Sequence, residues 1–148
     1  MKNVRKGNKE MEKTNVIITI ATKPKPKLRA RFNRKTGIAY NPDKNEDYES
    51  LIRWHCKQAT KHFFEGGICL ICNFYFKPPA STPKKKLESY YNATEPYTKK
   101  PDLDNLVKAV KDSLNGVLWK DDSQIVYVLA KKRYAQEDLV EIEVFNEL

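Results

Sequence analysis

Four stretches of the chain are rich in β-branched and aromatic residues, a pattern typical of β-strands. They are residues 16–20, 68–76, 124–134 and 139–145. The second stretch is apolar almost throughout, which favours a central place in a sheet. The last two are joined by the short polar segment Ala-Gln-Glu-Asp, and this connection predicts a β-hairpin.

Two other segments show the i, i+3, i+4 apolar spacing of an amphipathic helix. The first extends from Asp47 to about Glu65, and the pair Gly66-Gly67 is expected to end it. The second extends from Asp102 to Gly116, with Asp102 as a suitable N-cap. Its apolar face comprises Leu103, Leu106, Val107, Val110 and Leu114. The elements therefore follow the order strand, helix, strand, helix and hairpin.

Two polar segments show no such pattern. Residues 1–13 predict a disordered basic tail, so that the folded domain would comprise residues 14–148. Residues 77–101 are rich in lysine and proline and predict a long exposed loop. Long loops in compact domains are usually functional or disordered. Lysines with interleaved tyrosines are typical of segments that contact phosphates and stack on bases, and a plain flexible linker is the alternative.

Cationic side chains occur at alternate positions before the first predicted helix. They are Lys23, Lys25, Lys27, Arg29 and Arg31. In an extended chain, alternate side chains point to the same face. The pattern favours a strip that contacts phosphates, and the alternative is an exposed edge that charge keeps soluble.

The overall charge points to the class of partner. The 148 residues are enough for one domain with a hydrophobic core, and 28 Lys and Arg against 19 Asp and Glu give a formal net charge of +9. Such an excess favours nucleic acid first and an anionic membrane surface second. No apolar run approaches the roughly 20 residues that span a bilayer, and the N-terminus lacks a signal-peptide core. We therefore expect a cytoplasmic protein that has nucleic acid, and no membrane, as its partner.

The three cysteines are an odd number in a chain of this kind, so disulfides are not expected. Cys69 and Cys72 have the spacing of a zinc half-site. However, they lie in a predicted strand, where residues three apart point to opposite faces. Small buried thiols are the favoured interpretation.

Two pairs of acids stand out in this basic chain, Asp102 with Asp104 and Asp121 with Asp122. On the second predicted helix, Asp104 and Lys108 are spaced i, i+4 and share a face away from the apolar stripe. The segment that follows this helix is expected to return beside it and to bring one acid of the second pair close to the first. Clustered carboxylates repel one another, so such a site favours a bound cation.

Oxygen ligands without histidine or thiolate favour Mg²⁺, with Mn²⁺ as a second possibility. A carboxylate–metal centre within a basic protein indicates phosphodiester hydrolysis, in which the metal activates water and neutralises charge on the phosphate. The alternative is that Asp102 is simply an N-cap and Asp121-Asp122 simply a turn.

The segment PDLDNLVKAVKDSLNGVLWKDDSQI, residues 101–125, resembles the RusA family of Holliday junction resolvases, which occur in bacteria and are often carried by phages. That family shows a D-[LI]-D-N-[LI]-x-K helix, a D-[AS]-L-N-G-type turn and then W-x-D-D-x-Q-[IV]. Arg29-Ala-Arg31-Phe32 and Tyr40-Asn-Pro42 are similar to its R-P-R-[FW] and Y-x-P motifs, with Ala30 in place of proline. The resemblance covers about residues 16–146.

The resemblance implies a Mg²⁺-dependent endonuclease that acts as a homodimer and resolves four-way DNA junctions by paired nicks, in recombination and repair. It implies a small α+β domain, with a mixed sheet and two main helices packed on it. The family's catalytic acids correspond to Asp102, Asp104 and Asp122, and its catalytic lysine corresponds to Lys108. Asp121 is a candidate for an additional metal ligand.

The basic segments supply the candidate DNA contacts. These are Lys27, Arg29, Arg31, Lys84, Lys85, Lys86, Lys99 and Lys100. Two alternative functions remain open, a nuclease that acts on flaps or other branched DNA and a basic DNA-binding protein without enzymatic activity.

Overall fold

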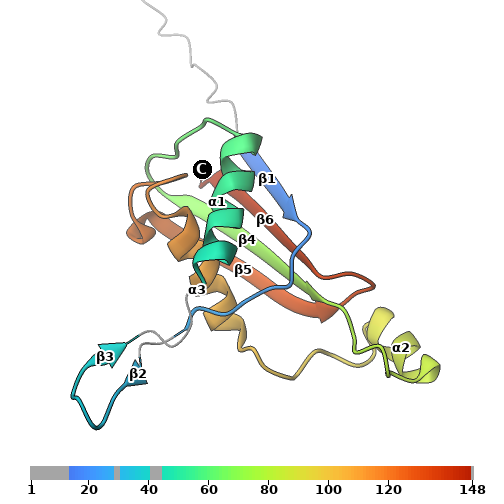
Figure 1. The fold of residues 1–148 in the computed structure, drawn as a ribbon. Helices are drawn as coiled ribbons and strands as arrows, with labels where there is room; N and C mark the ends of the chain where they lie inside the picture. The colour runs from blue at the N-terminus through green and yellow to red at the C-terminus, as the bar shows by residue number, and fades with distance from the viewer. Residues whose placement is uncertain (1–13, 29–30, 41–44, 148) are drawn as a thin grey trace, which may run out of the picture.

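The centre of the protein is a four-stranded mixed sheet with the strand order β1-β6-β4-β5 (Figure 1). In this computed structural model, the described residues are 14–28, 31–40 and 45–147. The four strands are β1 (Asn15–Ile20), β4 (Ile68–Phe76), β5 (Ile125–Tyr134) and β6 (Leu139–Asn146). β4 is an inner strand, as its apolar sequence predicts, and it pairs antiparallel with β6 and parallel with β5. The predicted positions of all four strands are confirmed.

The predicted hairpin between the last two strands is wrong, because β4 lies between β5 and β6. The four-residue connection passes the end of β4, where the Ala135 amide donates to the Phe76 carbonyl (3.0 Å). The Lys77 amide donates to Asp138 Oδ1 (2.8 Å) on the same connection. With β4 inserted between β5 and β6, this apolar strand has a partner on each edge. The short connection between β5 and β6 does not indicate that a third strand lies between them.

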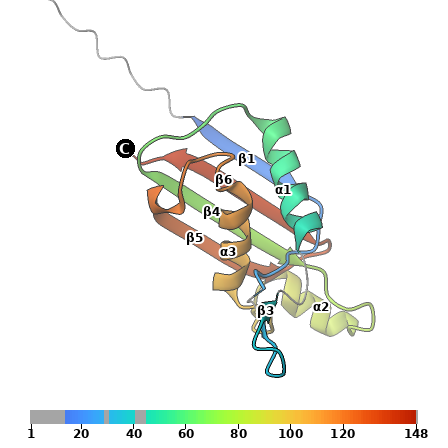
Figure 2. The same ribbon diagram turned by 60° about the vertical axis from the view of Figure 1, so that its left-hand side comes forward.

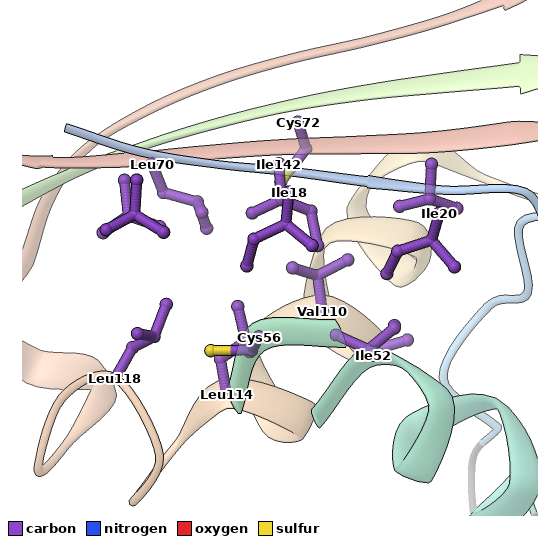
Figure 3. Packing of buried hydrophobic residues seen from close by; sticks show 14 of the residues in the cluster. Ile18, Ile20, Ile52, Cys56, Leu70, Cys72, Val110, Leu114, Leu118 and Ile142 are labelled. Carbon is purple, nitrogen blue, oxygen red and sulfur yellow. The ribbon is translucent and has the colours of Figure 1, made fainter. Parts of the chain in front are cut away.

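The helices α1 (Glu46–Ala59) and α3 (Leu103–Leu114) both cover one face of the sheet (Figure 2). Figure 3 shows Leu70 and Ile142 of the sheet facing Ile52 of α1 and Val110 of α3. The predicted α+β domain, with a mixed sheet and two main helices, is confirmed. None of the helices formed by the described residues is long and apolar enough to cross a membrane.

The first helix is shorter than its apolar spacing predicts. It ends at Ala59, and Thr60 already has extended backbone, with φ −156° and ψ 153°. The chain then turns so that the Phe64 amide donates to the Leu118 carbonyl (2.7 Å). Phe64 is fully buried in this position, whereas Phe63 is 46% exposed. A tertiary contact therefore ends the helix before the glycine pair.

The segment 77–101 contains a helix, α2 (Lys84–Tyr91), so the prediction of a continuous loop is wrong. Its sequence KKKLESYY has few apolar residues, and the helix is held by its last turn. The Tyr90 ring stacks on the Tyr134 ring of β5, with 3.7 Å between centroids. Tyr97 stacks in turn on Phe76, at 4.5 Å. Tyr90 and Tyr97 therefore pack against the domain, whereas Tyr91 is 42% exposed.

A two-stranded hairpin, β2 (Arg31–Phe32) and β3 (Ala39–Tyr40), projects from the body at the end where α3 begins (Figures 1 and 2). Its turn includes Gly37 with φ +69°, a left-handed conformation that glycine adopts without steric cost. The predicted tail at 1–13 and the candidate contact Arg29 lie outside the described residues. The side chain of Arg31 does as well.

The three cysteines are buried free thiols. Burial raises the pKa of the Cys72 thiol to about 12 and that of the Cys56 thiol to about 11. These thiols are therefore protonated at neutral pH, and they behave as small apolar core residues.

Candidate active site

Asp102 and Asp104 lie at the start of α3 and are both exposed. Asp102 occupies the N-cap position with extended backbone, but its side chain makes no capping hydrogen bond. Asp104 Oδ1 accepts a hydrogen bond from the Asn105 amide (2.9 Å). The positive end of a helix dipole stabilises carboxylates in the first turn, typically by about 0.3–1 kcal/mol each. The simple capping role is therefore not observed for Asp102, and its carboxylate projects outward.

The two acids border two adjoining hollows. Asp104 lines one hollow of about 910 Å³ together with Lys108 and Lys111. Asp102 lines the other, of about 740 Å³, together with Lys100 and other cations. The two hollows are both lined by Lys27, Leu28 and Asn105. Lysines thus surround the acid pair, and apolar side chains such as Leu28 line the hollows beside them.

Lys108 shares the hollow of Asp104, which confirms that the two residues lie on one face. Its ammonium is 3.7 Å from Asp112 Oδ1, one turn further along the helix, and its side chain is 60% exposed. An exposed i, i+4 pair of this kind contributes about 0.3–0.5 kcal/mol, so a phosphate can displace it at little cost.

Lys27 is more firmly held than a simple phosphate contact would be. Its ammonium donates to Glu49 Oε1 (2.9 Å) and lies 3.2 Å from Asp112 Oδ2. The hydrogen bond to Glu49 is the largest cause of its raised pKa; partial burial opposes the shift, and the bond to Asp112 adds to it. The Lys27 amide also donates to the Asn105 carbonyl (2.8 Å). Lys27 therefore links α1 to α3.

The second acid pair forms a turn just before β5. Asp121 caps a short 3-10 helix, η1 (Asp122–Gln124), and accepts hydrogen bonds from the hydroxyl and amide of Ser123. Those two bonds, the hydroxyl first, lower the pKa of the Asp121 carboxyl. Asp122 Oδ1 accepts from the Trp119 indole (3.4 Å). The turn role predicted as the alternative therefore applies to Asp121, while Asp122 is fixed from below by a buried tryptophan.

The two pairs lie at opposite ends of α3 and β5. The Lys132 ammonium near the end of β5 donates to the Pro101 carbonyl (2.8 Å), next to Asp102. Asp122 stands just before Ile125, where β5 begins. The strand from Ile125 to Lys132 spans about 23 Å at about 3.3 Å per residue. α3, with 12 residues, gives a similar span of about 18 Å.

The expectation that the return segment brings Asp121 or Asp122 beside the first pair is therefore wrong within one chain. The Gln124 side chain holds this segment at the far end, by donating to the carbonyls of Phe64 (3.1 Å) and Gly66 (3.2 Å). Among the described residues, no group of three or more acidic, histidine or cysteine side chains is placed to hold a metal ion. Within one chain, Asp102 and Asp104 both lie at the start of α3, and Asp122 lies beyond the other end of this helix.

The family model described as Endodeoxyribonuclease RusA matches residues 21–145. The chain belongs to the RusA family. A protein of Bacillus subtilis (strain 168), named Uncharacterized protein YqaN, is 30% identical over 134 residues, which are 87% of this chain and 94% of that protein. Crossover junction endodeoxyribonuclease rusA of Lactococcus phage r1t is 44% identical over 48 residues, 32% of this chain and 37% of the phage protein. The resemblance found in the sequence is confirmed, and the chain is an endodeoxyribonuclease.

In this RusA-family chain, α2 lies at the same end of the sheet as the start of α3 (Figures 1 and 2). Lys84 and Lys85 are exposed on α2, and Lys99 and Lys100 are exposed just before Asp102. The Lys86 ammonium is 3.3 Å from Glu95, an exposed pair that solvent screens.

Lys132 is a further residue of interest that the sequence pattern does not indicate. Its side chain reaches from β5 to the segment before Asp102. These partners are 31 and 33 residues away along the chain, so no local spacing rule could identify them.

Proposed function

We propose that this RusA-family endodeoxyribonuclease uses Mg²⁺ and cleaves four-way DNA junctions during recombination and repair. The observation that carries the proposal is the exposed Asp102 and Asp104 pair at the start of α3, surrounded by lysines. Carboxylate oxygens are the ligands that Mg²⁺ and Mn²⁺ prefer, so these donors fit either ion. Duplex binding alone would need the lysines but not the acids.

The roles of the side chains follow from their positions. A bound Mg²⁺ supplies an activated water and neutralises charge on the phosphate. Asp102 and Asp104 would hold this ion. Lys108 leaves its exposed pair with Asp112 and contacts the scissile phosphate, where its charge stabilises the transition state. Lys99 and Lys100 bind the flanking backbone and fix its register.

We further propose that the active form is a homodimer, and β5 supplies the supporting surface. β5 is an edge strand, and four consecutive apolar side chains on it are exposed: Val126 (54%), Tyr127 (49%), Val128 (42%) and Leu129 (52%). Exposed apolar edge strands are ready sites for pairing with another chain. A second copy related by a twofold axis near the middle of β5 would cover this strand.

Such a dimer would also complete the acid cluster. A twofold axis across β5 places the start of one strand beside the end of the other. The Asp122 of one copy then approaches Asp102 and Asp104 of its partner, which one chain alone does not achieve. Each dimer would contain two such composite sites related by symmetry, and this arrangement suits paired nicks on a junction that is itself nearly twofold.

The direct test is a cleavage gel with purified protein, a labelled four-way junction and a matched linear duplex. We expect symmetric nicks in the junction with Mg²⁺, no cleavage in EDTA and little cleavage of the duplex. Equal cleavage of a flap substrate would favour the alternative nuclease specificity. Binding without any cleavage, at all Mg²⁺ and Mn²⁺ concentrations, would contradict the proposal.

A further inference from the structure

The segment that leads into Asp102 is held by an unusual set of contacts. The ammonium of Lys132 donates to the carbonyls of Lys99 and Pro101, both at 2.8 Å. The Tyr97 hydroxyl donates to the carbonyl between them, that of Lys100, at 2.9 Å. Three successive carbonyls before Asp102 therefore each accept a hydrogen bond from a side chain.

The donors themselves are fixed by packing. The Tyr97 ring stacks on Phe76 and lies 4.7 Å from the Tyr134 ring. The Lys132 ammonium lies 5.1 Å from the centroid of the Tyr97 ring, within the range of a cation–π contact. Lys132 also belongs to β5, which is paired with β4 over its whole length. The contacts thus connect the segment to the four-stranded sheet.

The Pro101 carbonyl belongs to the same peptide plane as the Asp102 amide. Fixing this carbonyl therefore fixes the backbone orientation of Asp102. This matters because the Asp102 carboxylate makes no capping hydrogen bond that would orient it from its own side. Hydrogen bonds from a charged donor are roughly twice as strong as neutral ones. Lys132 thus restrains the backbone on the N-terminal side of Asp102, and the Leu106 amide, which donates to the Asp102 carbonyl (3.2 Å), restrains it on the C-terminal side.

We propose that Lys132 is a positioning residue that holds Asp102 in its metal-binding orientation. The inference rests on the proposed metal-binding role of Asp102. In this role Lys132 acts through the backbone, since two of the three N–H donors of its ammonium are engaged by the two carbonyls. Partners that orient metal ligands typically change metal affinity or activity by about 10–100-fold when they are replaced.

The test replaces Lys132 by methionine, which keeps the apolar stem and removes the donors. We expect the Mg²⁺ concentration for half-maximal single-turnover cleavage to rise by about 10–100-fold. Junction binding in EDTA should stay within about twofold, because no phosphate contact is lost. In the metal-free protein, amide hydrogen exchange over residues 99–104 should accelerate, while exchange in β4 should not change.

Two variants separate positioning from general stability. Lys132→Arg retains two donors and should recover most of the Mg²⁺ response. Lys131→Met, at an exposed neighbouring position, should match the parent in all three measurements. If Lys132→Met does not fold, Tyr97→Phe removes the bond to the Lys100 carbonyl alone and should give a smaller shift in the same direction.

Unchanged Mg²⁺ dependence together with faster exchange would overturn the proposal, because the segment would then be loosened without effect on the metal. A changed Mg²⁺ dependence with unchanged exchange would overturn it equally. The variant Asp102→Asn, measured alongside, separates the proposed metal-binding role of Asp102 from the positioning role of Lys132. Full cleavage by that variant would remove the proposed function, whereas loss of cleavage leaves the role of Lys132 to be decided by its own variants.

Discussion

The carboxylates of α3 are used in different ways although they are close in sequence. Asp112 is held between two lysines, 3.2 Å from Lys27 and 3.7 Å from Lys108. Asp102 and Asp104 face outward instead. Capping preference and i, i+4 spacing are local rules, so the sequence predicts which helix positions these acids occupy. It does not predict their partners, because Lys27 comes from a distant part of the chain.

Asp104→Asn is expected to lower cleavage by orders of magnitude. Asparagine keeps the shape but is a poorer Mg²⁺ ligand, and both water activation and charge neutralisation depend on the metal. Junction binding in EDTA should survive or tighten, because the substitution removes a charge that repels the phosphate. Single-turnover cleavage in Mg²⁺ beside a binding assay in EDTA measures both effects.

The matched control is Asp112→Asn on the same helix. Lys27 keeps Glu49 as a partner in this variant, so we expect a loss of about 1 kcal/mol or less in unfolding free energy and much higher residual cleavage. Parental cleavage by a folded Asp104→Asn variant would remove Asp104 from the site.

The local sequence pattern determines where the strands occur, but it does not determine how they pair. The four strands of the sheet occur where their composition predicts, but the pairing of β5 and β6 does not follow from the short connection between them. α2 has a weak apolar pattern because its stability comes from the contact of Tyr90 with Tyr134. Such contacts join distant segments, and periodicity within a segment contains no information about them.

The lysines of α2 test the role of that helix in DNA binding. Replacing Lys84, Lys85 and Lys86 together by alanine should weaken junction binding, because contacts to the phosphate backbone contribute affinity. The cleavage rate of the bound complex should change little, since α2 contributes no residue to the hollows around the acids. A binding titration and a single-turnover assay at saturating protein distinguish the two quantities.

The triple variant keeps the helix, because alanine has the highest helix propensity and the buried Tyr90 is unchanged. Normal binding with a large loss of single-turnover rate would contradict this assignment and would place α2 within the chemistry.

In the molecule as a whole, the two acid pairs lie at opposite ends of α3, and the exposed Lys99 and Lys100 come just before the first pair. The net charge of +9 predicts an anionic partner from composition alone. The distance between Asp122 and Asp102 could not be predicted in this way, because it depends on where the turn before β5 is anchored. This distance is the reason for proposing a site that two chains build together.

A heterodimer of two inactive chains tests this central claim most directly. One chain carries Asp104→Asn and the other Asp122→Asn, each with its own affinity tag, so that sequential purification isolates the mixed dimer. If sites are shared between chains, one site contains both substitutions and the other contains neither. The account predicts that this heterodimer nicks a four-way junction at one of its two symmetric positions, at a rate near that of a parental site.

The matched control pairs Asp104→Asn with Asp102→Asn, which leaves one substitution in each site and should remain inactive. Each homodimer should be inactive as well. Sites built within single chains would carry one substitution each in every combination, so no mixture would recover activity. Failure of the purified Asp104→Asn and Asp122→Asn heterodimer to nick the junction, under conditions where the parental dimer cleaves it, would contradict the shared site.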